Sequence, residues 1–218
     1  GLLERPVFVA ACFVPPQQST ALLSSFYSQL KRDVLAVQER GGVVVVGGDV
    51  NGRVGGASEA AAGGELGELA QAVVPQRESR DGVLNTQGRA LLQFCESAGL
   101  WIGNGRLAGD TPGEWTFHSL SCPGDASVVD YFLLDSDLVG RAGVGLQVHP
   151  PAELLDHSAV ELSWGPVVGA AGGGQRGGEL EGSPVGDEYR VAESSLGPFT
   201  DAVIERAVAF GVVSVVAE

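Results

Sequence analysis

The stretch VVVVGGDVNGRVGG, residues 43 to 56, organises the chain around it. Four consecutive valines predict a strand that is buried on both faces. Two glycines follow, which let the backbone pass close to a ligand or bend sharply. Asp49 and Asn51 come next, at the carboxyl end of the strand, where open sheets place their active sites, and they point to the same side if the chain stays extended. The same residue types also build ordinary turns, so this stretch alone leaves a plain turn as an alternative.

Two later stretches favour chemistry over a plain turn. SVVDYFLLDSDL, residues 127 to 138, places Asp130 in an otherwise apolar strand, where an unpaired carboxylate would be costly. LLDHSAVELSW, residues 154 to 164, places Asp156 and His157 directly before another apolar strand. A histidine oriented by a buried carboxylate can act as a general base or stabilise charge on a phosphoryl group. Each feature alone is commonly structural, but together they indicate a functional site.

The rest of the pattern predicts a layered α/β (α+β) domain with sheets at its centre. PVFVAACFV, residues 6 to 14, predicts a buried strand, and a helix is expected from Ser19 or Thr20 to Gly41. Residues 52 to 84 show no periodicity and predict a long loop or insertion. A second helix begins at Asn85 or Thr86 and ends at Gly99. Short strands are predicted at residues 100–103, 114–119, 128–134, 144–148 and 159–164.

The last quarter of the chain differs in composition. Residues 166–189 are rich in glycine without a regular period and predict a linker, and residues 190–218 predict a helical tail. The 218 residues contain no methionine, and the chain opens in the middle of a pattern. We therefore expect it to be a piece of a longer protein.

Bulk composition limits the classes of function. With 44% hydrophobic and 18% charged residues the chain is expected to fold, and no apolar run approaches the roughly 20 residues that cross a bilayer. Three cysteines, Cys12, Cys95 and Cys122, have no metal-type spacing, which favours a reducing, intracellular compartment and no disulfide-linked partner. Thirteen basic against 27 acidic residues give a net charge of -14. That charge argues against a tight DNA-binding module, but only weakly against a nuclease whose bound cation supplies positive charge locally.

Three motifs in order, GGDVNGRVG, SVVDYFLL and LDHSAV, resemble the endonuclease/exonuclease/phosphatase superfamily, which includes abasic-site endonucleases and DNase I. The segment NTQGRALLQFCESAGLWIGNGRLAGDTPGEWTFHS and the early FVPP are most similar to the endonuclease domains of non-LTR retrotransposons. The resemblance covers about residues 6 to 164, so residues 1–165 are interpreted as the carboxyl-terminal portion of such a domain. It implies a DNase I-like two-sheet β-sandwich flanked by helices and incomplete at its amino terminus.

The resemblance also implies a role for each motif residue. Asp49 would activate the attacking water or manage the leaving oxygen, and Asn51 would contact the phosphate. Asp130 would hold the catalytic His157, which also binds phosphate, while Asp156 would lie on the metal side or orient water. The implied cofactor is Mg²⁺, with Mn²⁺ as an alternative ion, and the implied partner is DNA.

The chain also departs from the family's pattern. A metal-binding glutamate and an asparagine are expected from earlier strands, before this chain begins, and Glu4 lies too close to the first strand to substitute. Phe13 stands where several members carry a tyrosine whose hydroxyl touches phosphate, and Leu155 replaces a serine.

The leading hypothesis is a DNA-nicking endonuclease of a retroelement, acting in the nucleus. A catalytically inactive remnant or protein-binding fragment, and a small-molecule phosphatase or phosphodiesterase, are the alternatives. Other polar and aromatic residues are expected to be structural or solvent-facing: His118, His149, Trp101, Trp115 and Trp164.

Overall fold

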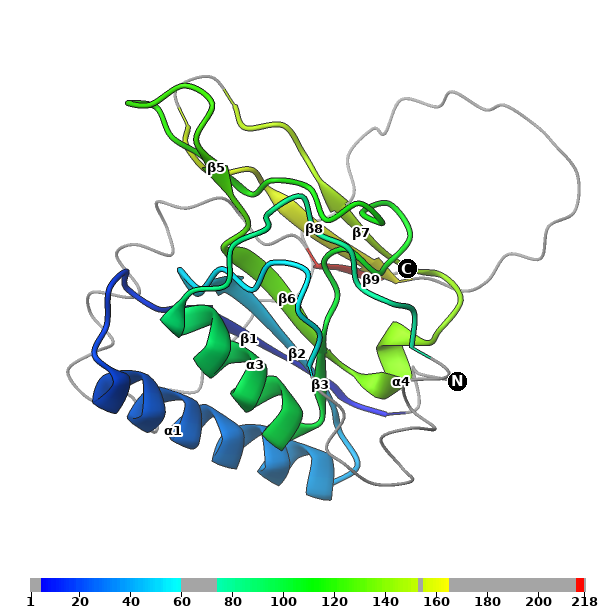
Figure 1. Ribbon diagram of the computed structural model, residues 1–218. Helices are drawn as coiled ribbons and strands as arrows, with labels where there is room; N and C mark the ends of the chain where they lie inside the picture. The colour runs from blue at the N-terminus through cyan, green and yellow to red at the C-terminus, as the bar shows by residue number, and fades with distance from the viewer. Residues whose placement is uncertain (1–4, 60–73, 153–154, 165–214, 218) are drawn as a thin grey trace, which may run out of the picture.

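The computed structural model describes residues 5–59, 74–152, 155–164 and 215–217. These residues form a mixed α/β fold with three sheets and three helices (Figure 1). The elements are β1 (Val7–Phe13), α1 (Thr20–Glu39), β2 (Val43–Asp49), α3 (Thr86–Ala98), β3 (Leu100–Ile102), β4 (Phe117–His118), β5 (Ala126–Ser127), β6 (Asp130–Asp135), α4 (Ser136–Val139), β7 (Val144–Val148), β8 (Val160–Trp164) and β9 (Val215–Ala217). The mixed α/β class predicted from the sequence is confirmed, while the DNase I-like form of the sandwich stays a prediction.

The largest sheet has the strand order β1-β2-β6-β3. β2 lies parallel to β1 and antiparallel to β6, and β6 is antiparallel to β3. All four valines of β2 are buried, as predicted. Because side chains alternate along a strand, Val44 and Val46 pack on one face of the sheet, and Val43 and Val45 pack on the other.

Two helices, α1 and α3, lie side by side on one face of this sheet (Figure 1). Local signals set their ends as predicted. Ser19 caps α1 by accepting a hydrogen bond from the N–H of Leu22, and Asn85 caps α3 by accepting one from Gly88. Gly99 closes α3 in the left-handed conformation.

The opposite face of the sheet packs against the second sheet, in which β8 lies between β7 and β9. Leu146 of β7 and Leu162 of β8 are fully buried in one cluster with Phe132 and Leu134 of β6. Because β8 comes directly after the LDHS motif, this packing brings that motif toward the ends of β2 and β6.

Two expected elements differ from the structure. β1 was predicted to be buried, but Phe8 and Val9 are 45% and 46% exposed, because β1 pairs only with β2 among the described strands. The strand predicted at residues 114–119 shrinks to β4, because Asp110 accepts a hydrogen bond from the N–H of Glu114 and holds the preceding chain in a turn.

The loop and tail predictions can be compared only in part. Residues 52–59 and 74–84 contain no helix or strand, as predicted, apart from a single bridge between Val54 and Leu84. The predicted linker and most of the helical tail lie outside the described residues. Val215–Ala217, at the end of that tail, form a short strand that pairs in parallel with β8.

None of the helices in the described part of the chain is both long and apolar enough to span a membrane. The three cysteines are free.

Candidate functional site

The first site residue, Asp49, ends β2 beside a backbone contact that only glycine permits. Gly48 has φ +146°, and a Cβ atom there would lie 1.9 Å from the carbonyl oxygen of Cys12 on β1. Gly48 therefore lets β1 lie close to β2 at the point where the carboxylate emerges, whereas the sequence predicted a sharp bend or a close approach to a ligand.

Asp130 begins β6 directly opposite Asp49 in the antiparallel register. The N–H of Asp130 donates to Thr116 Oγ1 (3.0 Å) and so points away from β2. Asp49 and Asp130 therefore form a non-hydrogen-bonded cross-strand pair, in which facing side chains lie closest. By strand alternation both project on the face that packs against β7 and β8.

His157 approaches from that second sheet, just before β8. Its segment bridges Phe117, and their rings meet edge-on with centroids 5.1 Å apart. Thr116 forms hydrogen bonds to both segments. Its hydroxyl oxygen accepts hydrogen bonds from the N–H groups of Val129 and Asp130. Its carbonyl oxygen accepts a hydrogen bond from the N–H of Ser158. One buried threonine thus links β6 to the histidine segment.

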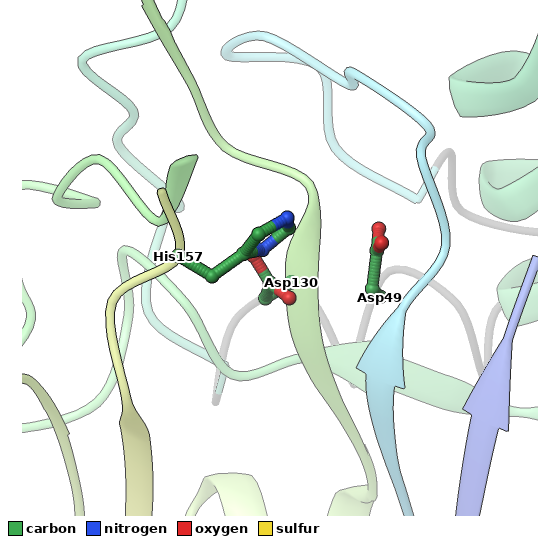
Figure 2. Close-up of side chains that lie close together, drawn as sticks. All are labelled: Asp49, Asp130 and His157. Carbon is green, nitrogen blue, oxygen red and sulfur yellow. The ribbon is translucent and has the colours of Figure 1, made fainter. Parts of the chain in front are cut away.

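The three side chains converge as Figure 2 shows. Nδ1 of His157 lies 2.9 Å from Oδ2 of Asp130, and ligand atoms of Asp49, Asp130 and His157 all lie within 4.8 Å of one another. The expectation that Asp130 needs a partner is confirmed, and that partner is His157. All three side chains are half-buried, so the site is reached from solvent but partly shielded from it.

Asn51 lies close to the site, but its backbone is not extended as expected. Its φ of 48° is left-handed, so the chain does not stay extended after Asp49. Its backbone N–H donates to Asp49 Oδ1 (2.9 Å), and its side-chain Nδ2 donates to Asp49 Oδ2 (2.9 Å) and to the carbonyl of Val14 (3.0 Å). The segment is therefore a turn whose asparagine holds the carboxylate. A phosphate contact from Nδ2, which the family resemblance implies, stays a prediction and requires one of these bonds to open.

Burial and the charges in the cluster shift the pKa values of Asp49 and His157. Burial, followed by the negative charge of Asp130, raises the pKa of Asp49 to about 6, against the opposing hydrogen bonds of Asn51 and the charge of His157. Burial alone would lower the pKa of His157, but the hydrogen bond and charge of Asp130, aided by Asp49 and Asp156, raise it. The cluster therefore favours the protonated form of the imidazole, while the raised pKa of Asp49 makes that carboxylate a stronger base than an exposed one.

The other residues implied by the family resemblance lie around this cluster. The carboxylate of Asp156 is not one of the three that converge; its backbone carbonyl accepts the N–H of His118 (2.6 Å), and its charge acts on His157. Phe13 pairs in register with Asp49 on the neighbouring strand. Leu155 is exposed beside Asp156.

Most residues given a structural role have one. His149 pairs with Glu161 on the outer surface of β7 and β8, and Trp101 stacks against the guanidinium of Arg106.

Thr116 is the site residue that sequence reasoning missed. Its only local signal is a polar β-branched residue in an aromatic-rich segment, which does not identify the strand that it contacts.

The donor set at the cluster fits a divalent cation. Carboxylate oxygens are the ligands that Mg²⁺ and Mn²⁺ prefer, and Mg²⁺ keeps several water ligands and needs few protein groups. Asp49 and Asp130 repel one another, as the raised pKa of Asp49 indicates, so a cation held by both would relieve that repulsion. Among the described residues no glutamate joins them.

No protein-family model matches the chain, and no curated protein matches it.

Proposed function

We propose that this chain is a divalent-metal-dependent phosphodiesterase and that its substrate is DNA, which it nicks as the endonuclease portion of a retroelement. The observation that carries the proposal is the convergence of Asp49, Asp130 and His157 within 4.8 Å. The choice of DNA, and with it a nuclear site of action, rests on the resemblance of the three motifs to retrotransposon endonucleases.

Each side chain has a chemical task in such a reaction. Asp49, with its pKa raised to about 6, is ionised at neutral pH yet basic enough to accept a proton from an attacking water. His157, whose protonated form is favoured by the hydrogen bond and charge of Asp130, which raise its pKa, donates a hydrogen bond to a phosphate oxygen and stabilises the charge that develops there. Asp130 fixes the orientation of the imidazole.

Asp49 and Asp130 would hold the metal ion, with water completing its coordination. The ion would supply positive charge that this acidic chain otherwise lacks, and would polarise the phosphate. Asn51 keeps both oxygens of Asp49 oriented through its two hydrogen bonds, so the carboxylate need not reorganise during the reaction.

The test is nicking of supercoiled plasmid by the purified chain with Mg²⁺, with Mn²⁺ and with EDTA. His157→Ala should lose the activity. His149→Ala is the matched control, because it removes a histidine that also pairs with a carboxylate at 2.9 Å, but on the outer surface. Equal nicking by wild type and His157→Ala would assign the activity to a contaminant. A folded wild-type chain that nicks with neither metal would overturn the endonuclease proposal.

Two alternatives are separated by the same protein preparations. Hydrolysis of bis(p-nitrophenyl) phosphate without plasmid nicking would indicate a small-molecule phosphodiesterase of the same chemistry. A folded chain that hydrolyses neither substrate would indicate an inactive remnant, an outcome favoured by the absence of a third carboxylate from the cluster in the described residues.

A further inference from the structure

We infer that Asn104, outside the cluster, is a positioning residue that holds Asp130 in place through the backbone of β6. This inference rests on the proposed function, because it concerns the same site. The main chain of β3 leaves the central sheet before it reaches the part of β6 that contains Asp130.

The last backbone rung between these strands is at Gly103, whose N–H donates to the carbonyl of Phe132 (2.7 Å). The carbonyl of Gly103 turns away and accepts from the N–H groups of Arg106 and Leu107. Gly105 follows with φ +75°, packed so closely on the carbonyl of Glu78 that a Cβ atom would lie 1.9 Å from that oxygen. The main chain is therefore committed to a turn and cannot continue the ladder.

Two backbone groups of β6 would then lack a partner: the N–H of Phe132 and the carbonyl of Asp130. The side-chain amide of Asn104 takes both. Its Oδ1 accepts from Phe132 N–H (3.0 Å), and its Nδ2 donates to Asp130 O (3.2 Å). A side-chain amide has the donor and acceptor of a peptide group, so Asn104 supplies the rung that the main chain of β3 does not.

This hydrogen-bonded rung lies at Asp130, whose carboxylate must stay in place to contact His157. Thr116 holds the N–H of Asp130, and Asn104 holds its carbonyl, so both backbone groups are fixed on the side away from β2. The carboxylate, which projects toward His157, is then aimed by backbone that cannot shift without breaking a buried hydrogen bond. Asn104 itself is fully buried, so solvent cannot replace its amide.

The test compares Asn104→Ala with Gln38→Ala. Gln38 is a matched control, because its amide bridges the carboxylate of Asp135 and the carbonyl of Ala98 at the opposite end of the same strand. The readout is the low-field proton resonance of His157 Nδ1 in its hydrogen bond to Asp130, which reports the pair directly and does not depend on catalysis.

The expected result is loss or a marked upfield shift of that resonance in Asn104→Ala, and an unchanged resonance in Gln38→Ala. Wherever hydrolysis is detectable, Asn104→Ala should lower kcat about 10- to 100-fold with little change in KM, because the histidine pair is displaced while the substrate surface is intact. An unchanged resonance in a folded Asn104→Ala would reduce Asn104 to a structural role and overturn the inference.

If Asn104→Ala does not fold, Asn104→Ser takes its place, since its hydroxyl can satisfy one of the two groups. Hydrogen exchange of the wild-type chain gives an independent check. The amide of Phe132 should exchange as slowly as the ladder amides of β6, and fast exchange would show that Asn104 does not close the rung. If the resonance shifts as expected but the wild type hydrolyses nothing, the proposed function fails and the positioning role stands.

Discussion

Replacing Asp49 by asparagine should stabilise the folded chain at neutral pH while removing the proposed catalytic base. Burial and the charge of Asp130 raise the pKa of Asp49 from 3.8 to about 6. A shift of about 2 units corresponds to about 3 kcal/mol by which ionised Asp49 destabilises the fold. This is an upper value for a half-buried group.

The sign follows from the direction of the shift. Because the folded pKa lies above the unfolded one, the favourable contribution of protonated Asp49 is complete below about pH 3.8 and is lost as pH rises through about 6. Asparagine does not titrate. It can, however, accept only one of the two hydrogen bonds from Asn51, a loss of about 1 kcal/mol at every pH. The variant should thus be less stable than wild type by about 1 kcal/mol near pH 3 and more stable by about 2 kcal/mol near pH 7.5.

Urea unfolding in EDTA, followed by tryptophan fluorescence at several pH values, measures this difference. Taking the difference between the two proteins cancels titrations common to both. Asp33→Asn, which removes the same charge from the exposed surface of α1, is the matched control. A flat difference for Asp49→Asn over the same range would refute the account of Asp49 as a carboxylate ionised against burial and a like charge.

Three further predictions follow from particular contacts. The kcat/KM of the wild type should fall as pH rises above the usual pKa of histidine, because His157, whose pKa Asp130 raises, then loses its proton; a profile that only rises would contradict the assignment of an acid. Gly48→Ala should cost at least about 2 kcal/mol in urea unfolding, because its Cβ would meet Cys12 O at 1.9 Å, and an unchanged midpoint would disprove the close strand contact. Glu59→Ala should lower the free energy of unfolding by about 3 to 5 kcal/mol, because it leaves the guanidinium of Arg106 buried without its carboxylate partner. Adding Arg106→Met should recover part of that loss if the pair is buried as described.

Several parts of the fold were predictable because their causes are local in the chain. The valines of β2, the capping side chains of Ser19 and Asn85, and the glycine that closes α3 at Gly99 each act on neighbouring residues. Periodicity and capping chemistry therefore predict these elements without knowledge of what packs against them.

Other features were missed because their causes lie far away in sequence. β1 has the composition of a buried strand, yet its exposure depends on which strands pair with it. The roles of Thr116 and Asn104 can be recognised only in the folded chain, where both side chains form hydrogen bonds to the backbone of β6.

The candidate site divides in the same way. The sequence by itself determined that Asp49 and His157 lie next to apolar strands and that Asp130 lies within one, where a polar residue needs a reason. Their motifs supplied the family resemblance. Only the tertiary structure decided that Asp130 faces Asp49 across a strand pair and that His157 reaches both from a second sheet. Residues separated by so much chain meet only through strand register and sheet packing, and those depend on buried contacts summed over the whole core.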